Sequence, residues 1–342
     1  MSVDSNIAAH DPNGCLYIDS PKPSPFYLSP NLIMATKASD PSDVYPGSNT
    51  TSVSVSWTAS CTIPSELAVI FDLYIGDPTL PMIPGSTLGP LATSYPTPNG
   101  VSISAGQSNV ATTVGPWDSS AIPHLSQPHH GCLLARVYPF GATPDTGDLT
   151  NYPANDQHYA QHNCTINTTD GQGMIIIPIR NGTLLKAPTM VSIHAVPDLE
   201  PSRATQDAIL PSLHLIPAFK QVATAPLRKV DLDVSAFRSQ PAPRLEEIQA
   251  SIGNEARALI EDREAAVRKI GVTPVRTVLP SQFFTTFNFT ADLTGATVGD
   301  AHFYDVTQVN AAGQTYGGIK VVIVVTPPPV LRAPTNVVAQ VK

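Results

Sequence analysis

The segment from Thr51 to Trp57 restricts most strongly what this chain can fold into. It reads Thr-Ser-Val-Ser-Val-Ser-Trp, so that Val53, Val55 and Trp57 alternate with serine. A two-residue period places all three apolar side chains on one face of an extended strand, whereas a helix would distribute them around its axis. The segment therefore predicts a β-strand with one buried and one solvated face.

Short apolar runs recur along the rest of the chain, separated by proline, glycine and asparagine. The 342 residues include 35 prolines but only 13% charged residues. Runs of this length are typical of strands, and the prolines between them indicate long loops. The runs are residues 67–75, 101–104, 110–114, 132–138, 159–166, 174–179, 190–196, 213–216, 230–234, 283–293, 299–308 and 318–325. The sequence predicts a mainly β protein, long enough for two domains.

Two residues interrupt these apolar runs in an informative way. Asp72 stands within the apolar run 67–75, where we expect it on the wetted face of the strand. Pro178 stands within the run 174–179. Because proline cannot donate a backbone hydrogen bond, that run is predicted to be an edge strand or to contain a bulge.

The segment between Trp117 and Ile166 carries a pattern of spaced residues. It contains His-x-Cys-Leu-x-Ala-Arg-Val and, further on, spaced asparagines, an alanine and an isoleucine. The residues are Trp117, His130, Cys132, Leu133, Ala135, Arg136, Val137, Asn155, Ala160, Asn163 and Ile166. This pattern resembles the end of bacterial immunoglobulin-like domains of the CARDB (cell-adhesion-related) kind, and residues 29–33 resemble their opening strand. The resemblance covers residues 29–170, lacks the usual Asn-x-Gly after the second strand, and implies a β-sandwich without implying a reaction.

The four cysteines, Cys15, Cys61, Cys132 and Cys164, all lie in the first half of the chain. The resemblance would place Cys61 and Cys132 near strands B and F, which a disulfide bridges in true immunoglobulin domains. It therefore implies a possible Cys61–Cys132 disulfide. The alternative is that both are small buried apolar residues. The spacings match no zinc motif.

These observations together predict two tandem immunoglobulin-like β-sandwiches, the second with a long α-helical insertion. The first sandwich spans residues 29–185 after an N-terminal extension, residues 1–28. The second spans residues 187–326, and a proline-rich tail, residues 327–342, follows it.

The helical insertion is predicted at residues 244–270. Pro243 precedes it, and Gly271 and Pro274 follow it, which are the expected boundary residues. Eleven of its 27 residues are charged, six acidic and five basic, in a chain otherwise poor in charge. Residues at three- and four-residue spacing form one apolar stripe, which we predict to be an interaction surface. They are Ile248, Ile252, Leu259, Val267 and Ile270. The stripe packs either against its own sandwich or against a neighbouring subunit.

Histidines supply the candidate metal ligands. His129, His130, His158 and His162 all lie around the runs 132–138 and 159–166. On a strand, His158 and His162 would share a face but stand about 13 Å apart, more than one metal ion spans directly. The alternative is that all four are polar loop and rim residues. No cofactor is predicted.

Charge and hydropathy exclude several classes of partner. The net charge is −8, and no basic run exceeds two residues, which argues against nucleic-acid binding. No apolar stretch approaches 18 residues, so we expect no membrane span. The first residues lack the basic and apolar parts of a signal peptide, so we expect cytoplasmic synthesis, with association to a particle or cell surface left open.

The chain also lacks the main hydrolase, zinc-protease, dinucleotide and phosphate-loop motifs. We therefore predict a non-enzymatic structural or interaction subunit of a larger bacterial or phage-type assembly or surface layer, with protein partners and self-association. One alternative is a carbohydrate- or ligand-binding module with exposed aromatics such as Tyr138, Tyr152 and Tyr159. Another is a metal-dependent enzyme that uses the histidines.

Overall fold

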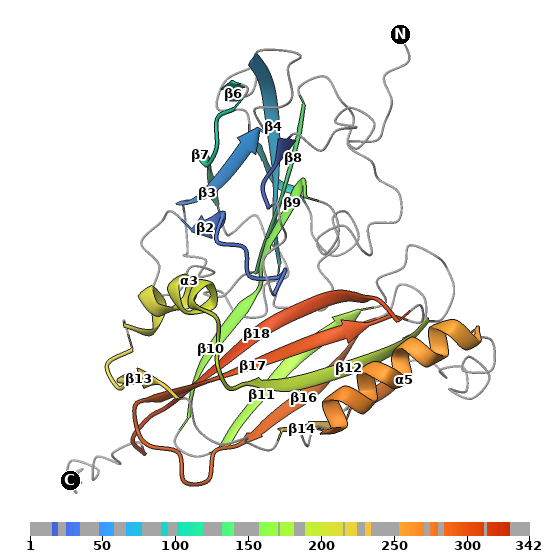
Figure 1. The fold of residues 1–342 in the computed structure, drawn as a ribbon. Coiled ribbons are helices and arrows are strands. Elements are labelled where there is room, and N and C mark those ends of the chain that lie inside the picture. Colours follow the sequence, from blue (N-terminus) through green and yellow to red (C-terminus); the bar gives the residue numbers. More distant parts are fainter. Residues whose placement is uncertain are drawn as a thin grey trace, which may run out of the picture.

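The structure, a computed structural model, is mainly β, which confirms the predicted class (Figure 1). The statements below concern the residues that it describes. These are 16–19, 25–34, 48–57, 66–76, 90–94, 101–104, 106–118, 132–139, 157–169, 172–180, 189–214, 216–223, 230–233, 253–269, 274–279, 284–310 and 313–328. Their strands form four sheets, two in an N-terminal half and two in a C-terminal half.

The N-terminal half consists of two antiparallel sheets around one core. The first sheet holds β1 (Leu16–Tyr17), β2 (Leu32–Met34), β3 (Ser48–Trp57) and β7 (Val110–Asp118). The second holds β4 (Glu66–Gly76), β5 (Pro90–Ser94), β6 (Val101–Ser104), β8 (Cys132–Pro139) and β9 (Tyr159–His162). Val53, Val55 and Trp57 of β3 share one buried cluster with Phe71 and Leu133 of the second sheet. The alternation in β3 therefore marks its buried face, as predicted.

The C-terminal half also has two sheets. The larger has the strand order β10 (Cys164–Thr169), β18 (Thr315–Val325), β17 (Asp300–Val309), β12 (Thr189–Asp198), β15 (Val275–Leu279), with β13 (Gln221–Val222) also paired to β17. The smaller has the order β11 (Gln172–Arg180), β16 (Phe284–Asp292), β14 (Val230–Asp233). Side chains of both sheets, among them Val191, Ile193, Phe287 and Phe289, form one core. Pro178 lies in β11 at the edge of the smaller sheet, as predicted.

Two described helices lie on the other face of the larger sheet, α3 (Arg203–Leu213) and α5 (Asn254–Lys269) (Figure 1). Ile209 and Leu213 of α3 pack with Phe303 and Val322, which alternate along their strands with residues of the core. The prediction of a strand at residues 213–216 was wrong, because Leu213 ends α3. The Ser202 hydroxyl accepts the Thr205 N–H at 3.2 Å and caps this helix.

The chain passes from one half to the other at a single residue, Asn163. β9 pairs with β8 of the N-terminal half, whereas β10 runs parallel to β18. Strands β10 and β11 therefore belong to the C-terminal half, although the predicted first domain extends to residue 185. Residues 159–166 read as one strand because the chain stays extended across Asn163 while its hydrogen-bonding partners change.

Candidate functional site

Helix α5, the predicted interaction element, crosses β12 on the outer face of the larger sheet (Figure 1). It begins at Asn254, and the Gly253 carbonyl accepts the Arg257 N–H. The predicted residues Ile248, Ile252 and Ile270 lie outside the described residues, as does the side chain of Val267. Leu259 is 46% exposed. The described buried face instead passes through Ile260 and Glu264, one position away from the predicted stripe.

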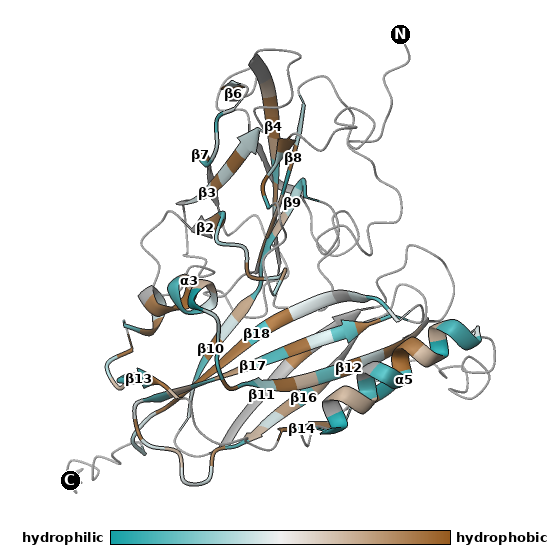
Figure 2. Cartoon of the chain, in the orientation of Figure 1, coloured by the Kyte–Doolittle hydropathy of each residue, from teal (hydrophilic) through white to brown (hydrophobic). Residues whose placement is uncertain are grey.

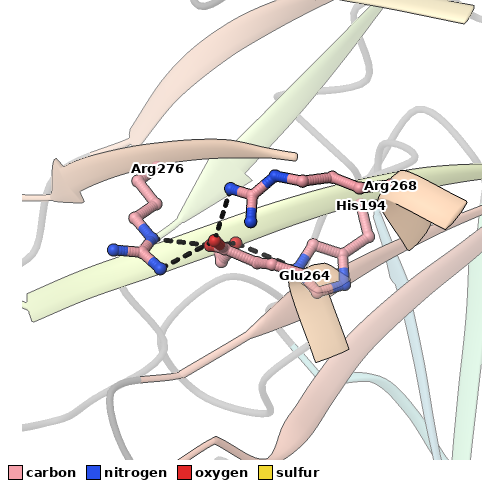
Figure 3. A network of polar contacts seen from close by, with 5 residues as sticks. His194, Glu264, Arg268 and Arg276 are labelled. Carbon is pink, nitrogen blue, oxygen red and sulfur yellow. Dashed lines mark hydrogen bonds and ion pairs between the residues drawn. The ribbon is translucent and has the colours of Figure 1, made fainter. Parts of the chain in front are cut away.

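The fully buried carboxylate of Glu264 joins α5 to the sheet (Figure 3). It accepts two hydrogen bonds from Arg276 of β15, at 2.6 and 2.7 Å. It also accepts one at 3.0 Å from Arg268, one turn along α5, and one at 3.0 Å from the Ser192 hydroxyl of β12. The imidazole Nε2 of His194 lies 2.9 Å from that hydroxyl. Ser192 and His194 face α5 because Val191, Ile193 and Ala195, which alternate with them, point into the core.

These contacts also determine the protonation of Glu264. Burial alone would raise the pKa of this carboxyl. The hydrogen bonds from Arg276 and Ser192 and the positive charges of Arg276 and Arg268 outweigh burial and hold its pKa below the usual value. Glu264 is therefore a charged anchor at neutral pH. A buried carboxylate of this kind fixes the rotation of α5 on the sheet, because only one helix face can present it to Arg276.

The opposite face of α5 is exposed and mostly hydrophilic (Figure 2). Exposed acidic residues, Glu255, Glu261 and Asp262, stand in its first two thirds together with the exposed base Arg257, and the exposed bases Arg268 and Lys269 stand at its end. The apolar exposed residues on this face are Ala258, Leu259, Ala265 and Ala266. The turn between β17 and β18 borders the helix closely. A Cβ added to Gly313, in that turn, would lie 2.6 Å from the Cβ of Leu259.

The histidine hypothesis receives no support from the part of the chain that the structure describes. His129 and His130 lie outside it. His158 and His162 are both buried, and the Nδ1 atom of His162 lies 3.3 Å from the Ser29 carbonyl oxygen. Among the described residues, no group of three or more histidine, cysteine or acidic side chains is placed to hold a metal ion.

The cysteine pairing stays a prediction. Cys61 lies outside the described residues, and for Cys132 the structure describes the backbone, opposite Gly76 in the β4–β8 pair. Cys164 is a buried thiol in the cluster beneath α3.

A second polar cluster, which sequence reasoning missed, lies where the two halves meet. The buried Lys320 of β18 contacts Asp305 at 2.5 Å and Asp198 at 2.8 Å. The Tyr27 hydroxyl, from the N-terminal half, donates to Asp305 at 2.5 Å. Burial and the negative charge of Asp305 raise the pKa of Tyr27 well above its usual range. The residues come from four separate segments, so no local sequence signal reveals the cluster.

The Tyr27 ring also covers Gly318 of β18. A Cβ at Gly318 would lie 2.0 Å from the ring, so a glycine is required there. The Asn163 side chain donates to the Gly318 carbonyl at 2.8 Å, while the Asn163 N–H donates to the Tyr27 carbonyl at 2.9 Å. The neighbouring Leu28 belongs to the cluster beneath α3. Tyr27 and Leu28 therefore contact the C-terminal half, although they fall within the predicted N-terminal extension.

In the N-terminal half, Asp72 is buried rather than wetted, which corrects the expectation from its sequence context. Its carboxylate lies 2.6 Å from the guanidinium of Arg136 on the adjacent β8. The Arg136 side chain also stands over the rings of Tyr74 and Tyr138. Tyr138 and Tyr159 are buried, and Tyr152 lies outside the described residues.

Comparisons with known proteins identify no family. No protein-family model matches the chain, and no curated protein sequence matches it. Among solved structures, the chain is similar to the collagen adhesin (CNA) from S. aureus. The sequence identity is 8% and the TM-score is 0.21, and the match covers 86% of this chain and 91% of that one. Its likeness to the CupB6 tip adhesin from Pseudomonas aeruginosa has 8% identity and a TM-score of 0.19, over 84% and 93% of the two chains. At these scores neither likeness supports an argument about function. None of the described helices is long and apolar enough to cross a membrane.

Proposed function

We propose that the protein is a non-enzymatic structural subunit that associates with further copies of itself through the exposed face of α5. The fully buried Glu264 is the observation that carries the proposal. Holding a carboxylate out of water is costly, and the arginines compensate for it in one helix orientation. That orientation leaves Leu259 about half exposed and directs charges of both signs outward.

The occupant we propose is α5 of a second copy, packed antiparallel about a two-fold axis. Such an arrangement brings Asp262 of each helix towards Lys269 of the other, so acidic and basic regions pair twice. Ala265 and Ala266, which lie at the centre of this pairing on the exposed face, are small enough for close approach of the two helices. Opposite charges aligned in this way favour one orientation over others.

The contact would be small. A helix of 16 residues is about 24 Å long. A pair of such helices buries less than the roughly 800 Å² per partner of a typical stable interface. We therefore propose weak pairwise association that gains strength from repetition in an assembly or layer. This proposal includes immunoglobulin-like sandwiches in both halves, the CARDB-like character of residues 29–170, and α5 as an insertion between β14 and β15.

The test is the concentration dependence of the mass in solution, measured by light scattering. Ala266→Asp should shift association to higher protein concentration, because Ala266 lies at the centre of the proposed pairing. Ala204→Asp is the matched control, because Ala204 is an exposed alanine on the other described helix, α3. Equal behaviour of the two variants, or a wild-type monomer at all concentrations, would refute the proposal.

Charge reversal adds a sharper test. Asp262→Lys should weaken association, and so should Lys269→Glu, because each places like charges together. The double variant restores opposite charges in the antiparallel arrangement and should recover association. Failure to recover would exclude the antiparallel pairing.

The ligand-binding alternative is less well supported. It requires aromatic side chains exposed on one face, whereas Tyr138 and Tyr159 are buried. Tyr138 donates a hydrogen bond to Asp72 at 3.3 Å, and Tyr159 lies opposite Arg136 in the β8–β9 pair, so both belong to the interior of the N-terminal half.

A further inference from the structure

The β10–β18 pair lies across the path along which tension through the chain must pass. Every strand of the N-terminal half precedes Asn163, and every strand of the C-terminal half follows it. A pull applied to the N-terminal half therefore enters the C-terminal half at the start of β10. A pull on the other end enters at the end of β18, after which the described chain runs on to Pro328.

These two points stand at opposite ends of one ladder. β10 and β18 are parallel, with six residue pairs from Cys164 opposite Lys320 to Thr169 opposite Val325 (Figure 1). Tension between the first residue of β10 and the last residue of β18 slides the strands along each other. The hydrogen bonds of the ladder then share the load, whereas a pull on two neighbouring ends would break them one after another.

Both ends of this ladder are reinforced. At its start, the Lys320 N–H donates to the Asn163 carbonyl at 3.0 Å, and the Asn163 side chain reaches the Gly318 carbonyl. At its end, the Thr326 N–H donates to the Thr169 carbonyl at 2.7 Å. The Lys320 ammonium also ties β18 to Asp305 of β17 and Asp198 of β12. β18 is thus held on both sides while β10 is pulled.

We propose that the protein is a tension-bearing link in which the β10–β18 ladder resists unfolding when the chain is pulled along its length. The use of this property in an assembly rests on the proposed structural function. The resistance itself does not, because it follows from strand direction within one molecule.

The test is single-molecule force spectroscopy of the full chain in two pulling geometries. Both use an azide-bearing residue in place of the exposed Ser102, which avoids the native cysteines. The second attachment replaces Pro328 in one protein and Gln314, exposed in the β17–β18 turn, in the other. Attachment at 328 loads the ladder from opposite ends, and attachment at 314 loads it from the same end. Unfolding of the C-terminal half is recognised by a length gain of about 55 nm with attachment at 328 and about 50 nm with attachment at 314, against about 20 nm for residues 103–163.

We expect a higher unfolding force for the C-terminal half with attachment at 328 than at 314, at the same pulling speed. Equal forces, or a lower force at 328, would overturn the proposal. The comparison uses one folded protein and single molecules, so self-association does not affect it. A monomeric protein with a strong ladder would refute the proposed association and leave this inference intact.

A pair of proline variants tests the ladder itself. The carbonyls of Asn163 and Thr169 accept hydrogen bonds from β18. The backbone N–H and C=O groups of the odd-numbered residues of β10 therefore point towards β18, and those of the even-numbered residues point away from it. Asn167→Pro removes a donor that faces β18, whereas Thr168→Pro removes one that faces outward. At constant force, the C-terminal half of Asn167→Pro should unfold about fivefold faster than that of wild type, because one hydrogen bond of about 1 kcal/mol corresponds to that change in rate. The unfolding rate of Thr168→Pro should stay within about twofold of wild type. Equal acceleration by both variants would overturn the assignment of the load to this ladder.

Discussion

Replacement of Glu264 by alanine tests the anchor of α5 most directly. The carboxylate accepts four hydrogen bonds, between 2.6 and 3.0 Å, and none of its surface reaches solvent. Removal of one member of a buried ion pair typically costs about 3–5 kcal/mol, because the remaining charge loses its compensation. The Arg268 side chain is 57% exposed and that of Arg276 27%, so both guanidinium groups can recover hydration. We therefore expect a loss at the lower end, about 3 kcal/mol.

Urea denaturation followed by circular dichroism measures this change in the free energy of unfolding, and hydrogen exchange of the α5 amides shows whether the helix detaches. Glu261→Ala is the matched control, since Glu261 is an exposed acid on the same helix. It should change stability by less than about 0.5 kcal/mol. A loss below about 1 kcal/mol for Glu264→Ala would mean that the carboxylate contributes little net stability, and the fixed orientation of α5 would lose its physical basis.

Three further outcomes follow from the buried polar contacts. Asp72→Ala should destabilise the N-terminal half by about 3–5 kcal/mol in urea denaturation, and Arg136→Met in the same chain should recover part of this loss, because no buried charge then remains unpaired. Gly318→Ala should lower the melting temperature, because its Cβ overpacks against the Tyr27 ring and costs about 1–3 kcal/mol of stability. In a double-mutant cycle, Gly318→Ala should cost less stability when Tyr27→Ala is also present. The pKa of Glu264 is lowered in the folded state, so its stabilising contribution is complete above its unfolded pKa and disappears as the pH falls through the folded value. Wild type should therefore lose stability on acidification more steeply than Glu264→Gln, and parallel curves would contradict the lowered pKa.

The sequence predicted the features that depend on local pattern. The alternation in β3 marked its buried residues, the proline in β11 marked an edge strand, and the charge-rich segment before residue 270 marked a helix. Features that depend on distant partners were missed. Asp72 looked like a solvated acid because its partner, Arg136, lies 64 residues away. The buried face of α5 was misplaced by one position because Glu264, a charged residue, occupies it.

The sheets divide the chain at Asn163 and not at the predicted domain boundary for a related reason. An extended chain reads the same whether it pairs with one sheet or changes sheets midway, so Asn163 carries no local sign of the exchange. The short helix α3 was missed because Pro211 stands in its last turn, where proline normally argues against a helix.

The exchange of sheets at Asn163 decides how the molecule can be divided. A fragment that starts at residue 187 lacks β10 and β11 and leaves one side of β18 and one of β16 unpaired, an open edge that invites aggregation. A fragment that starts at residue 164 keeps both sheets, yet it loses the Tyr27 ring that covers Gly318 and the hydroxyl that contacts Asp305. Neither half is therefore a transferable module. The smallest piece that can be moved into another protein with its interior intact is the pair of halves together, including the stretch around Tyr27 between β1 and β2.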